Sequence, residues 1–312
     1  MDSALPYNIY QTLTSGSGWS KINQEMAKKL FVKALMKNYM QISSLAGLGI
    51  IFFLLWLKNR RDKRIKIHCN KKSIYLPLLD KMKPVLDSYS PTFWIPSSLL
   101  RMAYIPDKLA HNYESYIRWK VKLHDGEVVA VDIHPKNHDS LPADTPTVIL
   151  LPGFYSDSNK TYCLKFCSEV ENILGWRTCV INRRGFGDMP FTKDKFVSYG
   201  LYEDIHSIIE AAADRFPYSR LYLVGVSMGA MNIQRYLAEY GKKPKIQAAV
   251  AISSPWNAET SMHRIEKNYF IKNEVFKQFL TKVRKHMHDP HFLNIIKKKK
   301  IDLGKNLYFY LH

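Results

Sequence analysis

The chain has two kinds of hydrophobic pattern, and the change between them falls near residue 116. From residue 147 onward, short apolar runs typical of buried strands alternate with stretches whose apolar residues recur at helical spacing. The predicted strands are 147–151, 177–181, the apolar run that starts at residue 221 and leads into the motif 225–229, and 246–252. The predicted helices are 160–174, 201–216 and 228–240. Strands that alternate with helices form a parallel sheet covered on both faces, so the pattern predicts an α/β fold.

Upstream of this alternation, the segment 117–133 has the pattern of a hairpin that turns at Asp125-Gly126, a strong turn dipeptide. A polar loop, 134–146, follows it. Residues 70–115 contain prolines and aromatic residues without a clear period. We expect helix and loop there, packed on the α/β domain.

The first long apolar segment is 39–57, which holds 19 residues without a charge. That length just spans the hydrocarbon core of a bilayer as a helix. A signal peptide fits poorly because the segment begins late and no small-residue cleavage pattern follows it. A buried core helix fits poorly because the segment is apolar all round and ends at a basic run. The sequence therefore predicts a single-pass membrane anchor.

The orientation of this anchor stays open, since basic residues lie on both of its sides. They are Lys21, Lys28, Lys29, Lys33 and Lys37 before it, and Lys58, Arg60, Arg61, Lys63, Arg64 and Lys66 after it. The positive-inside rule slightly favours a cytosolic C-terminal domain. The sequon at Asn159 could be used only in a lumenal domain. Endomembrane and plasma membrane both fit the pattern.

The C-terminal region is basic, with 12 basic and 4 acidic residues between Arg264 and Lys305 and apolar residues among them. One or two amphipathic helices are expected there. They could form a solvated cap, or a lid that contacts lipid headgroups. The expected parts of the chain are a tail (1–38), a transmembrane helix (39–57), a basic linker with lead-in helices (58–115), an α/β core (116–256) and a basic helical cap or tail (257–312).

Composition adds a net charge of +19, from 46 Lys and Arg against 27 Asp and Glu. Such a charge fits nucleic acid, an anionic membrane surface or a solvated exterior. Because no nucleic-acid-binding signature accompanies it, we expect a membrane partner and no nucleic acid. Three of the four cysteines, Cys163, Cys167 and Cys179, fall in apolar patterns and are expected to be buried free thiols.

The candidate chemistry centres on Ser227, which lies in a G-x-S-x-G motif between a predicted strand and a predicted helix. In that context the serine occupies a tight, strained turn, and Gly225 and Gly229 remove side chains that would collide there. The motif therefore predicts a nucleophile elbow. Two backbone N–H groups would stabilise the oxyanion: one from Met228, and one from Phe154 in the loop after the strand 147–151.

Other polar clusters carry weaker signals. The segment 182–187 lacks the full pattern of a phosphate-binding loop and favours a turn at the rim of the cleft. The histidines of 286–291 have no second cluster of ligands, which favours a polar turn over a metal site. The spacing of His134 and Asp139 matches that of glycerolipid acyltransferases, but it lies in a polar loop distant from Ser227 and is best explained as coincidence.

Several motifs in a fixed order carry a family resemblance. They are 91–94 (Pro-Thr-Phe-Trp), 152–154 (Pro-Gly-Phe), 182–187 (Asn-Arg-Arg-Gly-Phe-Gly) and 225–229 (Gly-Val-Ser-Met-Gly). Together with the anchor, they resemble the membrane-anchored α/β-hydrolase-domain lipases, in the branch with medium-chain phospholipases and monoacylglycerol lipases, over roughly residues 40–285. The resemblance implies hydrolysis of carboxylic esters in glycerolipids or phospholipids, without cofactor or metal. It assigns Ser227 as nucleophile and Phe154 and Met228 as oxyanion donors.

The sequence departs from this family after Ser227, which only 85 residues follow. The family's triad Asp and His come after two further strands, and no such pattern is present. The downstream histidines are His263, His286, His288, His291 and His312, and none matches a family position. We therefore expect a C-terminally truncated α/β-hydrolase fold that lacks its last two strands and exposes the strand 246–252 as an edge. The alternative to an ester hydrolase is a catalytically dead, membrane-tethered homologue that binds lipid or protein.

Overall fold

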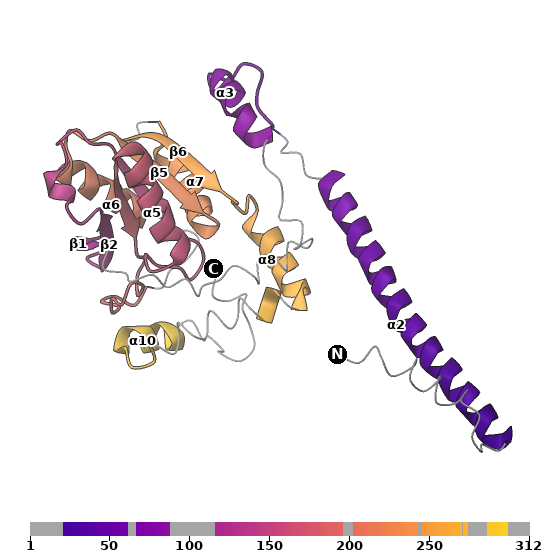
Figure 1. Cartoon of the computed structure of the whole chain (residues 1–312). Helices are drawn as coiled ribbons and strands as arrows, with labels where there is room; N and C mark the ends of the chain where they lie inside the picture. Colours follow the sequence, from indigo (N-terminus) through magenta and orange to yellow (C-terminus); the bar gives the residue numbers. More distant parts are fainter. Residues whose placement is uncertain are drawn as a thin grey trace. The chain divides into compact units, whose positions relative to one another are not determined.

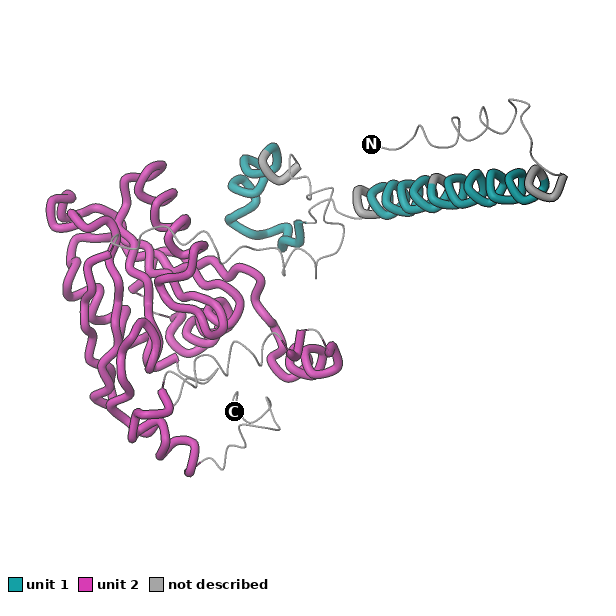
Figure 2. The backbone as a smooth tube through the Cα atoms, turned by 60° about the horizontal axis from the view of Figure 1, so that its bottom comes forward, with its two compact units in different colours: residues 1–106 teal, residues 107–312 magenta. Residues whose placement is uncertain are grey.

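The structure is a computed structural model that describes residues 21–61, 67–87, 116–195, 202–242, 245–269, 271–273 and 286–298. The chain divides into two compact units, residues 1–106 and residues 107–312 (Figure 2). The first unit contains α2 (Lys21–Arg61) and α3 (Leu76–Asp87). The motif at 91–94, most of the lead-in region and the last residues of the chain lie outside the described residues.

Helix α2 is a continuous helix of 41 residues (Figure 1). It contains the predicted transmembrane segment 39–57 and extends beyond it at both ends. Within it, the stretch Glu25–Leu57 is long and apolar enough to cross a membrane, as judged by length and composition. Most large apolar side chains along this stretch are exposed; Leu45, for example, is 70% exposed.

The second unit is built on a six-stranded sheet. Its strands are β1 (Ile117–Lys122), β2 (Val128–His134), β3 (Thr147–Leu151), β4 (Arg177–Ile181), β5 (Leu221–Val226) and β6 (Ile246–Ile252), in the spatial order β1-β2-β4-β3-β5-β6. The first two strands form the predicted antiparallel hairpin, with Gly126 at a positive φ of 85° in its turn. Strand β2 is antiparallel to β4, and the remaining pairs are parallel. The predicted mostly parallel sheet is confirmed.

Helices cover both faces of this sheet, as the alternation predicts (Figure 1). On one face, α6 (Tyr202–Arg215) and α7 (Met228–Tyr240) pack on alternate residues of the strands, such as Ile149 and Leu223, in the larger apolar core. On the other face, α5 (Thr161–Leu174) contributes Cys163 and Cys167 to a second cluster with Leu150. Strand β3 is buried on both faces, and β5 is buried on one face and half-buried on the other.

The strand β6 forms one edge of the sheet in the described part of the chain. Most of its residues are exposed, including Val250 at 53% and Ile252 at 42%. An exposed apolar edge strand is a ready template for pairing with another chain.

The basic C-terminal region contains two described helices, α8 (Ala258–Lys267) and α10 (Pro290–Lys298). Helix α10 buries Phe292 and Ile295, and the ring of Phe292 stacks on Phe191 with centroids 5.6 Å apart. The Asp289 carboxylate accepts hydrogen bonds from the backbone N–H groups of His291 and Phe292 at the start of α10. The polar turn expected over 286–291 is therefore the N-terminal cap of a docked helix.

Candidate active site

Ser227 lies between the end of β5 and the start of α7, at the carboxyl edge of the sheet. Its backbone has φ 54° and ψ −114°, far from the ordinary regions for an L-residue. Two backbone hydrogen bonds hold it there: its N–H donates to the carbonyl of Ile252 at 2.9 Å, and its carbonyl accepts from Met231 at 3.1 Å. The strained turn predicted from the motif is confirmed.

The glycines on either side of Ser227 allow the backbone segments to cross closely. A Cβ on Gly225 would lie 2.6 Å from the carbonyl carbon and oxygen of Gly229, where β5 passes under α7. A Cβ on Gly229 would lie 2.2 Å from the carbonyl oxygen of Leu151 at the end of β3. Side chains at these two positions would therefore push α7 away from both strands and change the turn that presents Ser227.

The loop after β3, residues 152–156, lies beside this turn because β3 and β5 are paired, with Leu151 opposite Gly225. A Cβ on Gly153 would lie 3.5 Å from Cβ of Ser227, so the two residues are close neighbours. The loop turns through a hydrogen bond from the Ser156 N–H to the Gly153 carbonyl at 3.2 Å, and Phe154 lies within this turn. The structure thus brings together Ser227 and the loop predicted to face it.

Phe154 lies in the 152–156 loop, and Met228 is the first residue of α7, directly after Ser227. Within the described residues, neither of their backbone N–H groups donates a hydrogen bond to a backbone carbonyl.

Two side chains hold the 152–156 loop from outside it, and sequence analysis assigned a role to neither. The hydroxyl of Tyr162, on α5, accepts a hydrogen bond from the Gly153 N–H at 2.8 Å. The guanidinium of Arg183, in the turn after β4, donates to the carbonyls of Pro152 at 2.5 Å and Gly153 at 3.1 Å. The only sequence signal was the position of Arg183 directly after a core strand.

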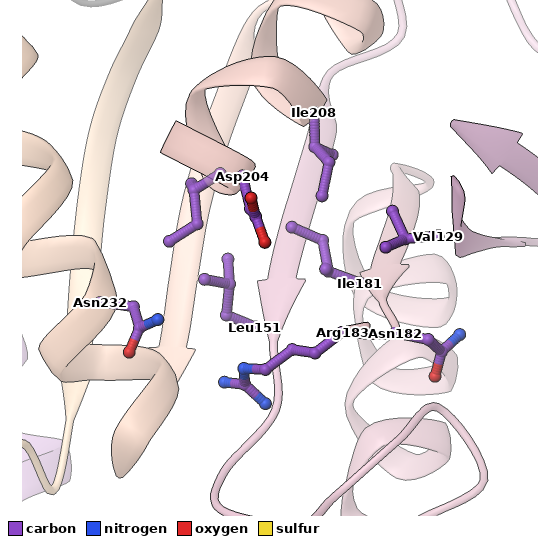
Figure 3. A pocket seen from close by; sticks show the side chains of 9 residues that line it. Val129, Leu151, Ile181, Asn182, Arg183, Asp204, Ile208 and Asn232 are labelled. Carbon is purple, nitrogen blue, oxygen red and sulfur yellow. The ribbon is translucent and has the colours of Figure 1, made fainter. Parts of the chain in front are cut away.

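A small cavity of about 20 Å³ lies beneath this region. Figure 3 shows the Arg183 side chain extending from the end of β4 toward Leu151, with Asn232 of α7 on the other side. Asn232 is only 3% exposed, and its Oδ1 atom has no hydrogen-bond partner within the described structure. The cavity is large enough for about one water molecule.

The rest of the 182–187 turn is structural. Arg184 is fully buried and donates to Asp204 at 2.7 and 2.6 Å, and its Nη1 lies 2.8 Å from the carboxylate of Asp125. Burial works against its charge, but these carboxylates raise the pKa of Arg184 above its ordinary value. Gly187 has φ 65°, and a Cβ there would lie 2.6 Å from Cγ of Asn182, so both the backbone conformation and the space favour glycine. The predicted turn is confirmed. Its Arg184 binds buried carboxylates, whereas its Arg183 binds the 152–156 loop.

No base for Ser227 is found in the described ranges, where no histidine ring hydrogen-bonds to its Oγ atom. His291 instead contacts the carboxylate of Asp194 at 2.9 Å, and Lys298 contacts the same carboxylate at 2.7 Å. The hydrogen bonds from Lys298 and His291 lower the pKa of Asp194. His263 is exposed on α8, and His312 lies outside the described residues.

Comparison with known proteins identifies the fold family. Residues 146–292 match the family described as alpha/beta hydrolase fold, and this part of the chain is therefore an α/β-hydrolase domain. The domain contains Ser227, the 152–156 loop and the carboxyl edge of the sheet.

Some of the curated relatives are named as lipid hydrolases. The mouse (Mus musculus) protein named phospholipase ABHD3 is 26% identical over 257 residues, which cover 79% of this chain and 61% of the mouse protein. The Saccharomyces cerevisiae protein named monoacylglycerol lipase is 28% identical over 166 residues, which cover 50% of this chain and 37% of the yeast protein. The chain thus spans less than two thirds of the length of these relatives.

Among solved structures, the Pyrococcus furiosus esterase Pf2001 matches with a TM-score of 0.40 and 18% identity, over 52% of this chain and 65% of that chain.

Proposed function

We propose that this protein is a membrane-anchored serine hydrolase that cleaves carboxylic esters of glycerolipids or phospholipids. The observation that carries the proposal is the position of Ser227, in a strained turn at the carboxyl end of β5 with the 152–156 loop beside it. In this reaction Oγ of Ser227 attacks the acyl carbonyl while a general base takes its proton, and the N–H groups of Phe154 and Met228 stabilise the negative charge on the carbonyl oxygen. The ester C–O bond then breaks, the alcohol leaves with that proton, and water hydrolyses the acyl-enzyme to release the fatty acid.

The names of the relatives support the substrate class, since they include a phospholipase and a monoacylglycerol lipase. The helix α2 supports the anchor: Glu25–Leu57 has sufficient length and apolar character to span a bilayer. An anchored domain would meet lipid esters at the membrane surface.

A second candidate is a catalytically inactive homologue that binds lipid or protein in the same cleft. The observation that favours it is that no described histidine forms a hydrogen bond with Oγ of Ser227. A serine hydroxyl is a weak nucleophile without an adjacent base. The two candidates predict the same fold and opposite reactivity at Oγ.

Covalent labelling with a fluorophosphonate probe separates the two candidates. We expect the purified full chain in detergent to be labelled and Ser227→Ala to remain unlabelled. The matched control is Ser253→Ala, because Ser253 is also a serine at positive φ (52°) but is exposed after β6. Labelling equal to that of the wild type is expected for this control. A folded wild-type protein that takes up no probe would contradict the hydrolase proposal and support the binding homologue.

Substrate class is tested with phosphatidylcholine and monoacylglycerol in mixed micelles, by measuring released fatty acid. Release from either lipid by the wild type, absent in Ser227→Ala, is the expected result. Cleavage of short soluble esters without release from any of these lipids would contradict the lipid assignment and leave the esterase assignment in place.

A further inference from the structure

Successive peptide units of the 152–156 loop differ in how many of their groups are hydrogen-bonded. Two side chains from outside the loop, Arg183 and Tyr162, take part in these bonds. The peptide unit between Pro152 and Gly153 is bound at both ends: its carbonyl accepts from Arg183 and its N–H donates to Tyr162. The next unit, between Gly153 and Phe154, is bound at its carbonyl by Arg183 and by the Ser156 N–H. Its own N–H, that of Phe154, has no described acceptor.

This pattern fixes the direction of the Phe154 N–H. A peptide unit is planar and trans, so its carbonyl and its N–H point to opposite sides. When Arg183 and Ser156 hold the Gly153 carbonyl, the Phe154 N–H can no longer rotate independently. A hydrogen bond to the carbonyl also polarises the same amide group, which makes its N–H a stronger donor.

Tyr162 accepts a hydrogen bond from the neighbouring backbone N–H, that of Gly153. Burial raises the pKa of its phenol, so the hydroxyl is neutral near pH 7 and accepts from Gly153 without adding charge. The Tyr162 hydroxyl and the Cβ of Ser227 lie 3.7 and 3.5 Å from the position that a Cβ on Gly153 would occupy. Both groups therefore border the same small volume next to the nucleophile.

We propose that Arg183 and Tyr162 form a clamp on the 152–156 loop that directs and polarises the Phe154 N–H as an oxyanion donor. This inference rests on the proposed hydrolase function. In this role the cation and the phenol act through the two peptide units between Pro152 and Phe154. Arg183 suits this role because it is 9% exposed and its forked donors reach two successive carbonyls.

The clamp is tested with Arg183→Met, Arg183→Lys and Tyr162→Phe in the full-length protein, using a p-nitrophenyl ester. We expect Arg183→Met to lower kcat about 100-fold, the typical effect of losing one oxyanion donor, with KM changed by less than about threefold. Arg183→Lys keeps the charge and loses the fork, so it should fall between Arg183→Met and the wild type. Tyr162→Phe should lower kcat by about tenfold. An alkyl boronic acid, which forms a tetrahedral adduct with the serine, should bind Arg183→Met about 100-fold more weakly.

Two matched controls lie away from the loop. Arg235→Met removes an exposed arginine of α7 that pairs with Glu239, and Tyr218→Phe alters a tyrosine that is 75% exposed. Both should keep kcat, KM and boronic acid affinity within about twofold of the wild type. If Arg183→Met fails to fold, Arg183→Lys and Tyr162→Phe decide the question with the same measurements.

Hydrogen exchange provides a readout that does not need activity. We expect the Gly153 amide to exchange at least about tenfold faster in Tyr162→Phe, while amides of β3 keep their wild-type rates. A wild type that takes up no probe but shows this exchange pattern would contradict the proposed function and keep the clamp. An active wild type whose Arg183→Met and Tyr162→Phe variants keep kcat within threefold, or whose Gly153 amide exchange is unchanged, would overturn the clamp.

Discussion

The backbone of Ser227 stores strain that the surrounding packing must offset. A non-glycine residue in a sparsely populated φ/ψ region costs about 1–3 kcal/mol. The strain persists because α7 is seated on β3 and β5, and this contact depends on Gly225 and Gly229 having no side chain. The two glycines flank Ser227 in the sequence: Gly225 lets α7 lie close to β5, and Gly229 lets α7 lie close to β3.

Gly229→Ala tests this dependence. The added methyl would lie 2.2 Å from the carbonyl oxygen of Leu151, and a strand backbone cannot move aside as a flexible side chain can. Alanine is favoured over glycine in a helix by about 1 kcal/mol, but the overlap outweighs that gain. We expect the free energy of unfolding to fall by about 2 kcal/mol or more, measured by urea denaturation in detergent.

Gly153→Ala is the contrasting variant. Its methyl would have only ordinary contacts, 3.5 Å from Cβ of Ser227 at the nearest, so stability should change by less than about 0.5 kcal/mol. Labelling of Ser227 by the fluorophosphonate should nevertheless slow, because the methyl occupies space beside the nucleophile. Equal stability losses in the two variants would show that the close crossing of α7 and β3 is not what limits position 229.

At the level of helices and strands, the sequence was most informative where the apolar runs are short and have clear ends. The bounds of β3, β4 and β6 were predicted to the residue, because each is a short apolar run between polar segments. The elbow at Ser227 was also predictable, since its glycines are required locally. The contacts of Arg183 and Tyr162 were not, because they join residues up to 31 positions apart and depend on how β4 and α5 pack beside β3.

The start of helix α10 could not be predicted from the spacing of apolar residues alone. The apolar residues between 264 and 305 predicted amphipathic helices, but the point at which the last one begins depends on a capping side chain. Asp289 provides that cap and also accepts from the backbone N–H of Phe191 at 2.8 Å. One carboxylate thereby starts α10 and fastens it to the loop that follows β4.

Asp289→Ala should release this helix without unfolding the sheet. Loss of an N-cap costs about 0.5–2 kcal/mol, and the contact with Phe191 is lost as well. We expect amides of α10 to exchange at least about tenfold faster, while those of β5 stay protected. Asp144→Ala, at an exposed aspartate in the loop before β3, is the control and should leave both regions unchanged. Uniform loss of protection in α10 and β5 would contradict an independent docking of α10.

At the scale of the whole chain, the property to be tested is whether α2 spans a membrane. Its apolar stretch, Glu25–Leu57, satisfies the length requirement of a membrane span, and basic residues follow it. A helix that is apolar on all sides must be covered by lipid or by protein. A charge placed in the helix is unfavourable in both environments, but it weakens membrane insertion in one and the stability of the folded domain in the other, which makes the assignment testable.

Leu48→Arg, at the centre of the expected span 39–57, tests the membrane assignment. An arginine at the middle of a spanning helix costs about 2.5–3.5 kcal/mol of insertion free energy, whereas one at the edge costs far less. We therefore expect Leu48→Arg to increase the fraction of protein extracted from membranes at alkaline pH, and Asn38→Arg, with the same change in charge, to remain in the membrane pellet. If α2 were instead a core helix, Leu48→Arg would lower the thermal stability of the hydrolase domain, and wild type and variant would both be extracted. That result would contradict the anchor while leaving the chemistry of Ser227 untouched, because the two proposals depend on different units of the chain.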